Sequence, residues 1–356
     1  MELINKIKKN NQTHTVDKSE LQVLLDKANS VYQQNFSNEV YFERSVFINW
    51  TCAIADCKYC YLSTKPKHNA GEKPTAIRSK ESILAEVLIC KALGWDIGYI
   101  TGGLRVESTE NLIDLVQKIN QVTGRKIMMN FGPYSRPIIE KFKPHILGMG
   151  SAIESFDENL HNFICPSKPL KVLIKFLEDL QELQLQKLIT IILGLGEHKD
   201  DVSLVIKNIK HYNIEKVQLC FLKPQENTIF DDVPSPNMEY MASWVAQIRI
   251  ACPNIQIKVA LVKERIDDFS LLLKAGINGF SRFMVFDDFN SNLARTLEKE
   301  CLEAGRKLKG NFTSLPELDL YKLVLELPFD KELKEKILVK AEQYYRKLKK
   351  KAPDGI

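Results

Sequence analysis

The sequence predicts a (β/α)8 barrel of the TIM type, an α/β fold in which parallel strands alternate with helices. Short β-branched or apolar runs alternate with longer amphipathic runs from about residue 41 to about residue 305. Eight such strand–helix units follow one another, and this alternation is typical of a parallel sheet. Residues with unusual chemistry fall just after the strands, at the end where such barrels carry their active sites. An open, doubly wound sheet is the alternative.

The expected strands are runs of β-branched, aromatic and aliphatic residues. They are Val46–Trp50, Ile97–Thr101, Lys126–Phe131, Ile146–Gly150, Leu188–Leu193, Lys216–Phe221, Ile255–Leu261 and Gly279–Val285. Helices are expected where apolar residues recur every three or four positions. These are Ser79–Leu93, Glu107–Val122, Pro137–Phe142, Leu170–Gln184, Asp200–His211, Met238–Ala251, Ile266–Lys274 and Asn290–Ala304.

Helical extensions are expected on both sides of the barrel. Residues 1–40 indicate two helices, with Asp17 as an N-cap candidate before the apolar set that begins at Leu21. Residues 41–305 would form the barrel. Residues 306–356 are charged and mainly helical over Asp330–Lys350, and they would pack outside it.

Composition excludes several classes of protein. The 356 residues are 44% hydrophobic and 27% charged, with a net charge of +5, which is ordinary for a globular protein. A nucleic-acid binder usually has a stronger basic stripe, so no nucleic-acid partner is expected. No apolar run reaches the roughly 18–20 residues of a membrane span, and the N-terminus lacks the apolar core of a signal peptide. We therefore expect a cytoplasmic protein with no membrane partner and with reduced cysteines.

The strongest chemical signal is a group of three cysteines directly after the first expected strand. Cys52, Cys57 and Cys60 are spaced C-x4-C-x2-C. Thiolates at such spacing bind a metal ion or an iron–sulfur cluster. A zinc knuckle is the structural alternative, although it needs a fourth protein ligand. The other cysteines are isolated in the sequence and are interpreted as structural; they are Cys90, Cys165, Cys220, Cys252 and Cys301.

This triplet resembles the signature of the radical S-adenosylmethionine (SAM) superfamily. That signature has three cysteines after the first barrel strand and an aromatic residue before the last, and Tyr59 stands at the aromatic position. The usual spacing is C-x3-C-x2-C, so this chain has one extra residue, and a bulge or a helical turn within Ala53–Asp56 is expected to absorb it. The resemblance implies that Cys52, Cys57 and Cys60 bind one [4Fe-4S] cluster, with one iron left open for SAM.

Two further segments resemble SAM-binding motifs of the superfamily. Gly102 and Gly103 follow the second strand, where the superfamily has a Gly-Gly segment near the methionine part of SAM. Glu154 follows the fourth strand, where the biotin synthase branch has an acidic residue that holds the ribose.

The adenine side is implied by the next two strands. After the fifth strand, Ile192, Gly194 and Glu197 fit the adenine-contact motif of the superfamily. Leu222 lies in a segment that resembles the one lining the adenine after the sixth strand.

Within the superfamily, residues 45–285 resemble the branch of biotin synthase, HydE and PylB. In biotin synthase, two strands supply cysteines to an auxiliary cluster, but here Lys126–Phe131 and Leu188–Leu193 contain none. Sulfur insertion by that route is therefore not expected. The lengthened cysteine gap, together with Glu154–Asp157 and Ile164–Pro169, resembles the HmdB (HcgA) family of iron-guanylylpyridinol cofactor biosynthesis, which serves [Fe]-hydrogenase.

The resemblance implies an enzyme that cleaves SAM reductively at the cluster to give a 5′-deoxyadenosyl radical. The radical would act on a small-molecule substrate, and the electron would come from a donor such as ferredoxin or flavodoxin. Two alternatives stay open. One is a different biotin synthase-like enzyme, similar to HydE or PylB, and the other is a SAM-binding regulator without turnover.

Overall fold

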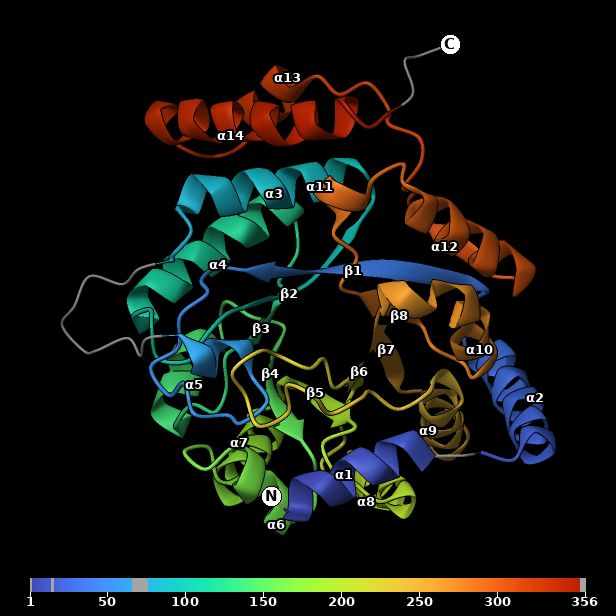
Figure 1. Ribbon diagram of the computed structural model, residues 1–356. Coiled ribbons are helices and arrows are strands. Elements are labelled where there is room, and N and C mark those ends of the chain that lie inside the picture. The colour runs from blue at the N-terminus through green and yellow to red at the C-terminus, as the bar shows by residue number, and fades with distance from the viewer. Residues whose placement is uncertain (1, 14–15, 66–75, 353–356) are drawn as a thin grey trace.

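The computed structural model describes residues 2–13, 16–65 and 76–352. Eight parallel strands close into a barrel, because β2 to β8 pair in sequence order and β1 pairs with both β8 and β2 (Figure 1). This confirms the predicted α/β barrel. The strands are β1 (Glu39–Phe47), β2 (Asp96–Thr101), β3 (Met128–Asn130), β4 (Gly148–Glu154), β5 (Gln186–Leu193), β6 (Lys216–Phe221), β7 (Gln256–Ala260), β8 (Gly279–Ser281) and an added strand β9 (Lys307–Lys309).

Helices surround the barrel, and α2 begins at the N-cap that the sequence predicts. Asp17 Oδ1 accepts from the backbone N–H groups of Ser19 and Glu20 at 2.9 and 3.1 Å, which satisfies free donors at the start of a helix. The helices are α1 (Glu2–Thr13), α2 (Lys18–Asn35), α3 (Lys80–Ala92), α4 (Thr109–Thr123), α5 (Arg136–Phe142), α6 (Glu158–Ile164), α7 (Leu170–Glu182), α8 (Val202–His211), α9 (Met238–Ala251), α10 (Phe269–Lys274), α11 (Val285–Asp288), α12 (Asn292–Glu303), α13 (Leu320–Leu325) and α14 (Lys331–Lys349).

The bounds of β1 and β4, which both end at the cysteine loop or the site, differ from the prediction. β1 begins at Glu39 and ends at Phe47, so the predicted strand Val46–Trp50 was placed too late. The start of β1 was missed because it contains charged residues, which are unusual in a buried strand. Glu43 can be buried there because Lys216 and Lys258 of distant strands pair with it. β4 continues to Glu154, which pairs with Ile191 of β5 after a register shift. Glu154 is therefore the last residue of a strand and not part of the following loop.

The prediction also lacked some elements. The short helix α6 and the strand β9 were not expected, and the predicted last strand Gly279–Val285 is only three residues long in the structure. β9 pairs in parallel with the first residues of β1. A three-residue strand at a sheet edge has too little periodicity to be distinguished from a loop by its sequence.

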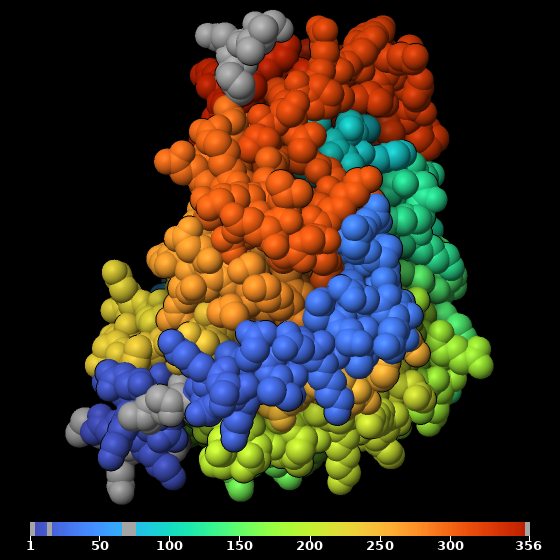
Figure 2. All heavy atoms as spheres, turned by 90° about the vertical axis from the view of Figure 1, so that its right-hand side faces the viewer, coloured from blue at the N-terminus to red at the C-terminus, as the bar shows by residue number. Residues whose placement is uncertain are grey.

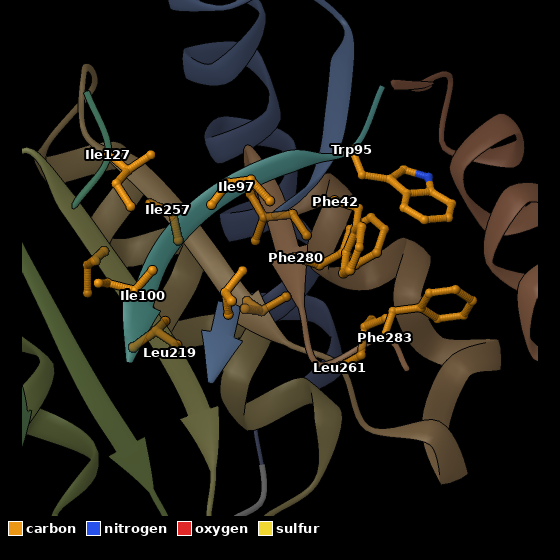
Figure 3. Packing of buried hydrophobic residues seen from close by; sticks show 14 of the residues in the cluster. Phe42, Trp95, Ile97, Ile100, Ile127, Leu219, Ile257, Leu261, Phe280 and Phe283 are labelled. Carbon is orange, nitrogen blue, oxygen red and sulfur yellow. The ribbon is translucent and has the colours of Figure 1, made fainter. Parts of the chain in front are cut away.

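Apolar side chains fill the layer between the barrel and its helices (Figure 3). The ring of Phe42 on β1 lies 6.3 Å from Trp95 and 5.7 Å from Phe280, measured between centroids. Phe312, which follows β9, lies 5.4 Å from Phe42. Edge-to-face and tilted aromatic pairs of this kind are favourable beyond the area they bury. They anchor the chain after β9 to the barrel.

An ion network joins strands that are not neighbours in the sheet across the interior of the barrel. Glu43 of β1 accepts hydrogen bonds from Lys216 of β6 and Lys258 of β7. The Lys258 ammonium also lies 4.4 Å from the ring centroid of Tyr99 on β2. Burial opposes ionisation of Glu43, but the two ammonium groups outweigh it and lower the pKa of Glu43 to about 2. Strands far apart in the sequence are thereby joined through one carboxylate.

The N-terminal and C-terminal helices pack on different sides. α2 packs against α9, and α14 packs across α3 on the outside of the barrel (Figure 1). Figure 2 shows the side of the molecule that is on the right in Figure 1, where the N-terminal residues, in blue, lie below the orange C-terminal segment. Within the described residues, no helix is long and apolar enough to cross a membrane.

Candidate functional site

The three cysteines of the triplet lie on one loop between β1 and the short helix η1 (Tyr61–Thr64). Their side chains are half-buried and form no disulfide. The backbone N–H of Leu104 donates to Cys52 Sγ at 3.3 Å. Backbone hydrogen bonds to sulfur are among the features that set the potential of iron–sulfur clusters. Free, half-buried thiols with a backbone donor aimed at one sulfur fit a cluster site.

A single metal ion places different demands on its ligands. Among the residues that the structure describes, no three Cys, His, Asp or Glu side chains lie close enough together to hold one ion. A zinc ion needs sulfurs at about 2.3 Å. In a cubic cluster each thiolate binds a different iron, so the sulfurs stay further apart.

Gly102 and Gly103 hold the cysteine loop against the end of β2. A Cβ on Gly103 would lie 1.7 Å from the carbonyl oxygen of Thr51, and one on Gly102 would lie 2.7 Å from Asn49 Oδ1. The same Asn49 oxygen accepts from the Gly103 N–H at 2.7 Å. The two glycines are therefore required by the close approach of the cysteine loop itself. Asn49 is a positioning residue that the sequence did not single out.

The extra residue of the cysteine motif is absorbed by a bend and not by a helical turn. The chain bends at Ala53 and Ile54. Ala55 then adopts a φ of 44°, in the left-handed region that non-glycine residues rarely occupy. The extra residue therefore lies in a bent segment within Ala53–Asp56, and the alternative of a helical turn is wrong.

The thiols of the loop have different surroundings. Burial is the main cause that raises the pKa of Cys60 to about 11, and its cysteine neighbours in the triplet add to the rise. A hydrogen bond from the Cys165 thiol lowers the pKa of Cys57. Cys165 is isolated only in the sequence, since the fold places it beside Cys57. Because metal binding requires thiolates, cluster assembly would release protons here.

Glu154 is the centre of a buried polar group. Its Oε1 accepts from the Tyr59 hydroxyl at 2.8 Å and from Lys168 Nζ at 2.8 Å, and Lys168 also reaches Oε2 at 3.0 Å. Burial opposes the charge of Lys168, but Glu154 outweighs it and raises the pKa of Lys168 above its ordinary value. Burial and the neighbouring carboxylate both raise the pKa of Tyr59. Lys168 was not assigned a role from the sequence, because its partner stands 14 residues away across α6.

The residues at the ends of β5 and β6 make two kinds of contact. The Glu197 carboxylate accepts from the backbone N–H groups of Gly194, Leu195 and Gly196 at 2.7 to 3.2 Å. It therefore shapes its own loop. Ile192 and Leu222 belong to an apolar group that also contains Cys57, Tyr59 and Cys165. The structure thus brings the cysteine loop and the predicted adenine-side residues together at the carboxyl ends of β4 to β6.

A cavity of about 400 Å³ opens beside the cysteine loop. Ile54 and Leu104 form its wall near Cys52, and Arg105 and Lys168 are its charged lining residues. No carboxylate lines it. The cavity lies outside the group around Ile192, on the β2 and β3 side of the loop.

Comparisons with known proteins agree with this geometry. The profile described as the radical SAM superfamily matches residues 51–209. Uncharacterized protein MJ0597 of Methanocaldococcus jannaschii is 32% identical over 321 residues, which cover 89% of this chain and 88% of that protein. The biotin synthase of Thermotoga neapolitana is 25% identical over 63% of this chain and 81% of its own.

A solved structure agrees on the architecture. Methylornithine synthase (PylB) superposes with a TM-score of 0.69 at 18% identity, covering 86% of this chain and 97% of that one. At that identity the likeness shows the fold alone. The profile match and the extended likeness to MJ0597 carry the assignment. The chain therefore belongs to the radical SAM superfamily, whose members use an iron–sulfur cluster and SAM, and it is a radical SAM enzyme.

Proposed function

We propose that this enzyme binds one [4Fe-4S] cluster through Cys52, Cys57 and Cys60 and acts in biosynthesis of the iron-guanylylpyridinol cofactor of [Fe]-hydrogenase. When bound, the cluster supplies the electron that cleaves SAM into methionine and a 5′-deoxyadenosyl radical. The observation that carries the cluster assignment is the Leu104 N–H donated to Cys52 Sγ at 3.3 Å, on a loop fixed by Gly103.

SAM would lie between the cysteine loop and the ends of β4 to β6. Glu154 is proposed to accept from the ribose hydroxyls, although Tyr59 and Lys168 already donate three hydrogen bonds to a carboxylate with about four acceptor positions. Its side chain is 1% exposed, so the cover formed by Tyr59 and Lys168 must shift to admit the ribose. Ile192 and Leu222 would contact the adenine, and Glu197 would keep the Gly194 loop in shape.

Gly102 and Gly103 are proposed to approach the methionine part of SAM, as the Gly-Gly segment of the family does. Their close packing on Asn49 and Thr51 leaves the backbone after β2 fixed beside the cysteine loop. A fixed backbone next to the open iron would orient the amino and carboxylate groups without a reorganisation cost.

The interior of the barrel supports a reaction other than sulfur insertion. Met128 of β3 and Leu188 of β5 pack with Tyr99 as a separate buried group. Lys258 of β7 is bound to Glu43. The strands that would supply an auxiliary cluster thus present apolar or ion-paired side chains. This arrangement, with the lengthened cysteine gap, favours the HmdB-like role over a biotin synthase reaction.

The first experiment tests whether the protein binds the cluster and cleaves SAM. The protein is reconstituted anaerobically with iron and sulfide, then given dithionite and SAM, and iron content and 5′-deoxyadenosine are measured. Cys52→Ala, Cys57→Ala and Cys60→Ala should each lose the visible cluster absorption and the product. Cys90→Ala is the matched control, because that thiol is fully buried in α3. Retained turnover in any triplet variant would refute the ligand assignment, and SAM binding without 5′-deoxyadenosine would favour a regulator.

The second experiment tests the biosynthetic role. Deleting the gene in a host that makes [Fe]-hydrogenase should remove the iron-guanylylpyridinol cofactor from extracts, and the wild-type gene should restore it. Unchanged cofactor content, with turnover intact in vitro, would point to a HydE-like or PylB-like reaction. Reduced ferredoxin or flavodoxin should replace dithionite if either is the electron donor.

A further inference from the structure

The helix α1 lies outside the matched superfamily segment but packs on the predicted adenine side of the site. Ile7 is 1% exposed and belongs to the apolar group of Ile192 and Leu222. Lys8 pairs with Asp232 in the chain that follows β6. α1 also lies close to α6 at the lower end of the barrel in Figure 1, because a Cβ on Gly196 would lie 2.9 Å from Ile7 and 3.3 Å from Leu160 of α6. An N-terminal helix thus closes over the loops after β5 and β6.

Asn11 is the polar residue at the centre of this contact. Its side chain is 5% exposed, and Nδ2 donates to the carbonyl oxygens of Gly194 at 2.8 Å and Pro234 at 2.9 Å. These two acceptors fix the orientation of the amide, because the flipped form would place Oδ1 against two carbonyl oxygens. Asn11 Oδ1 is buried and has no hydrogen-bond partner among the described residues.

A buried acceptor without a donor is uncommon in folded proteins and needs an explanation. The position of Asn11 supplies one. A Cβ on Gly194 would lie 2.7 Å from Pro236 Cδ and 3.2 Å from both Asn11 Nδ2 and Leu222 Cβ, so Asn11 and Leu222 pack around the same glycine. Asn11 therefore borders the same loop and the same apolar group as the predicted adenine contacts.

We propose that Asn11 is a specificity-determining residue for the nucleobase, and that its Oδ1 accepts a hydrogen bond from the 6-amino group of adenine. This inference rests on the proposed function, since it assumes SAM binding beside Ile192 and Leu222. An amide pinned by two carbonyls offers only an acceptor to the ligand. It selects a base with a donor at position 6 and rejects a 6-oxo base, whose oxygen would face Oδ1.

The test compares two ligands that differ at that position. Binding of S-adenosylhomocysteine and S-inosylhomocysteine to the cluster-loaded protein is measured by calorimetry. We expect the wild type to bind the adenosyl ligand at least tenfold more tightly. Asn11→Ala should bring the ratio of the two dissociation constants close to one, mainly by weakening the binding of the adenosyl ligand. Gln12→Ala, an exposed neighbour on the same helix, should keep the wild-type ratio.

Loss of α1 docking must be separated from loss of the amide. Hydrogen exchange of α1 reports docking, and Ile7→Ala loosens the helix while keeping Asn11. The proposal is supported if Ile7→Ala keeps the wild-type preference for the adenosyl ligand and Asn11→Ala loses that preference. Equal binding of both ligands by the wild type, an unchanged ratio in Asn11→Ala, or equal loss in both variants overturns it. Failure of both ligands to bind the loaded wild type would instead contradict the proposed function.

Discussion

Lys168 Nζ lies 2.8 and 3.0 Å from the two carboxylate oxygens of Glu154. Both side chains are almost fully buried, at 5% and 1% exposure. Glu154 also adopts a φ of 56°, in the left-handed region. The ion pair and the Tyr59 hydrogen bond therefore hold a strained residue in place at the end of β4. Strain of this kind persists where the surroundings fix it, and it is concentrated at functional sites.

Removing the Lys168 ammonium should destabilise the protein strongly. Lys168→Met leaves the Glu154 carboxylate buried and unpaired, which costs about 3–5 kcal/mol. The double variant Lys168→Met/Glu154→Gln should recover part of that loss, because no uncompensated charge remains. Urea unfolding of the cluster-free protein measures both values. Lys171→Met, an exposed position on α7, is the control, and equal stability of the Lys168 and Lys171 variants would contradict a tight pair.

Adding one methyl group at Gly103 should prevent cluster assembly. In Gly103→Ala the Cβ would overlap the Thr51 carbonyl, so the cysteine loop must move away from β2 and Cys52 must lose the Leu104 N–H. Iron content after reconstitution is the measurement. Gly124→Ala is the control, because it strains the backbone at a φ of 77° but brings its Cβ within 4 Å of no atom, so it tests a glycine substitution without the steric overlap. A full iron complement in Gly103→Ala would show that this close packing is dispensable.

Cys165 should tune the cluster without binding it. Its thiol donates to Cys57, and a donor to a cluster sulfur stabilises the more negative, reduced state. Cys165→Ala should therefore keep the iron content and lower the reduction potential measured by redox titration. Cys220→Ala tests another buried cysteine of the same apolar group and should leave the potential unchanged. Loss of iron in Cys165→Ala would instead identify it as a ligand.

Local sequence patterns predicted the fold, but they could not indicate contacts between residues on opposite sides of the barrel. The helix Met238–Ala251 was predicted at its observed bounds, because Asn237 caps it and apolar periodicity runs through it. The start of β1 was missed, because the partners of Glu43 lie on β6 and β7, more than 170 residues away. Lys168, Cys165 and Asn11 were missed for the same reason. Each gains its significance from a neighbour that only the folded chain supplies.

Stability should fall in acid through Glu43. Its pKa is lowered from an ordinary 4.5 to about 2 on folding, so its contribution is complete above about pH 4.5 and is lost as the pH falls through about 2. The loss is on the order of 3 kcal/mol, since one pKa unit corresponds to about 1.4 kcal/mol. Unfolding free energies of the cluster-free protein between these pH values measure it. Glu43→Gln should flatten the dependence of the unfolding free energy on pH, and Glu332→Gln should not. If the curves of Glu43→Gln and the wild type are parallel, Glu43 is not the source of the acid sensitivity.

The cysteine loop holds its extra residue in a strained conformation. Ala55 sits at a φ of 44°, and a non-glycine residue pays about 1–2 kcal/mol there. Ala55→Gly should relieve that strain and, after the added freedom of the unfolded chain, stabilise the protein by a few tenths to about 1 kcal/mol. Ala53→Gly, at a residue outside the left-handed region, should destabilise it and is the matched control.

Deleting Ala55 restores the common C-x3-C spacing and tests whether the bend is only an accommodation. The loop is anchored before the bend, where Leu104 donates to Cys52, and after it, where the Lys58 N–H donates to the Ile164 carbonyl at 2.9 Å. Because both anchors lie outside the deleted residue, the three sulfurs should still reach one cluster. Iron content should be retained, with at least partial formation of 5′-deoxyadenosine. Complete loss of the cluster would show that the surrounding barrel requires the longer loop.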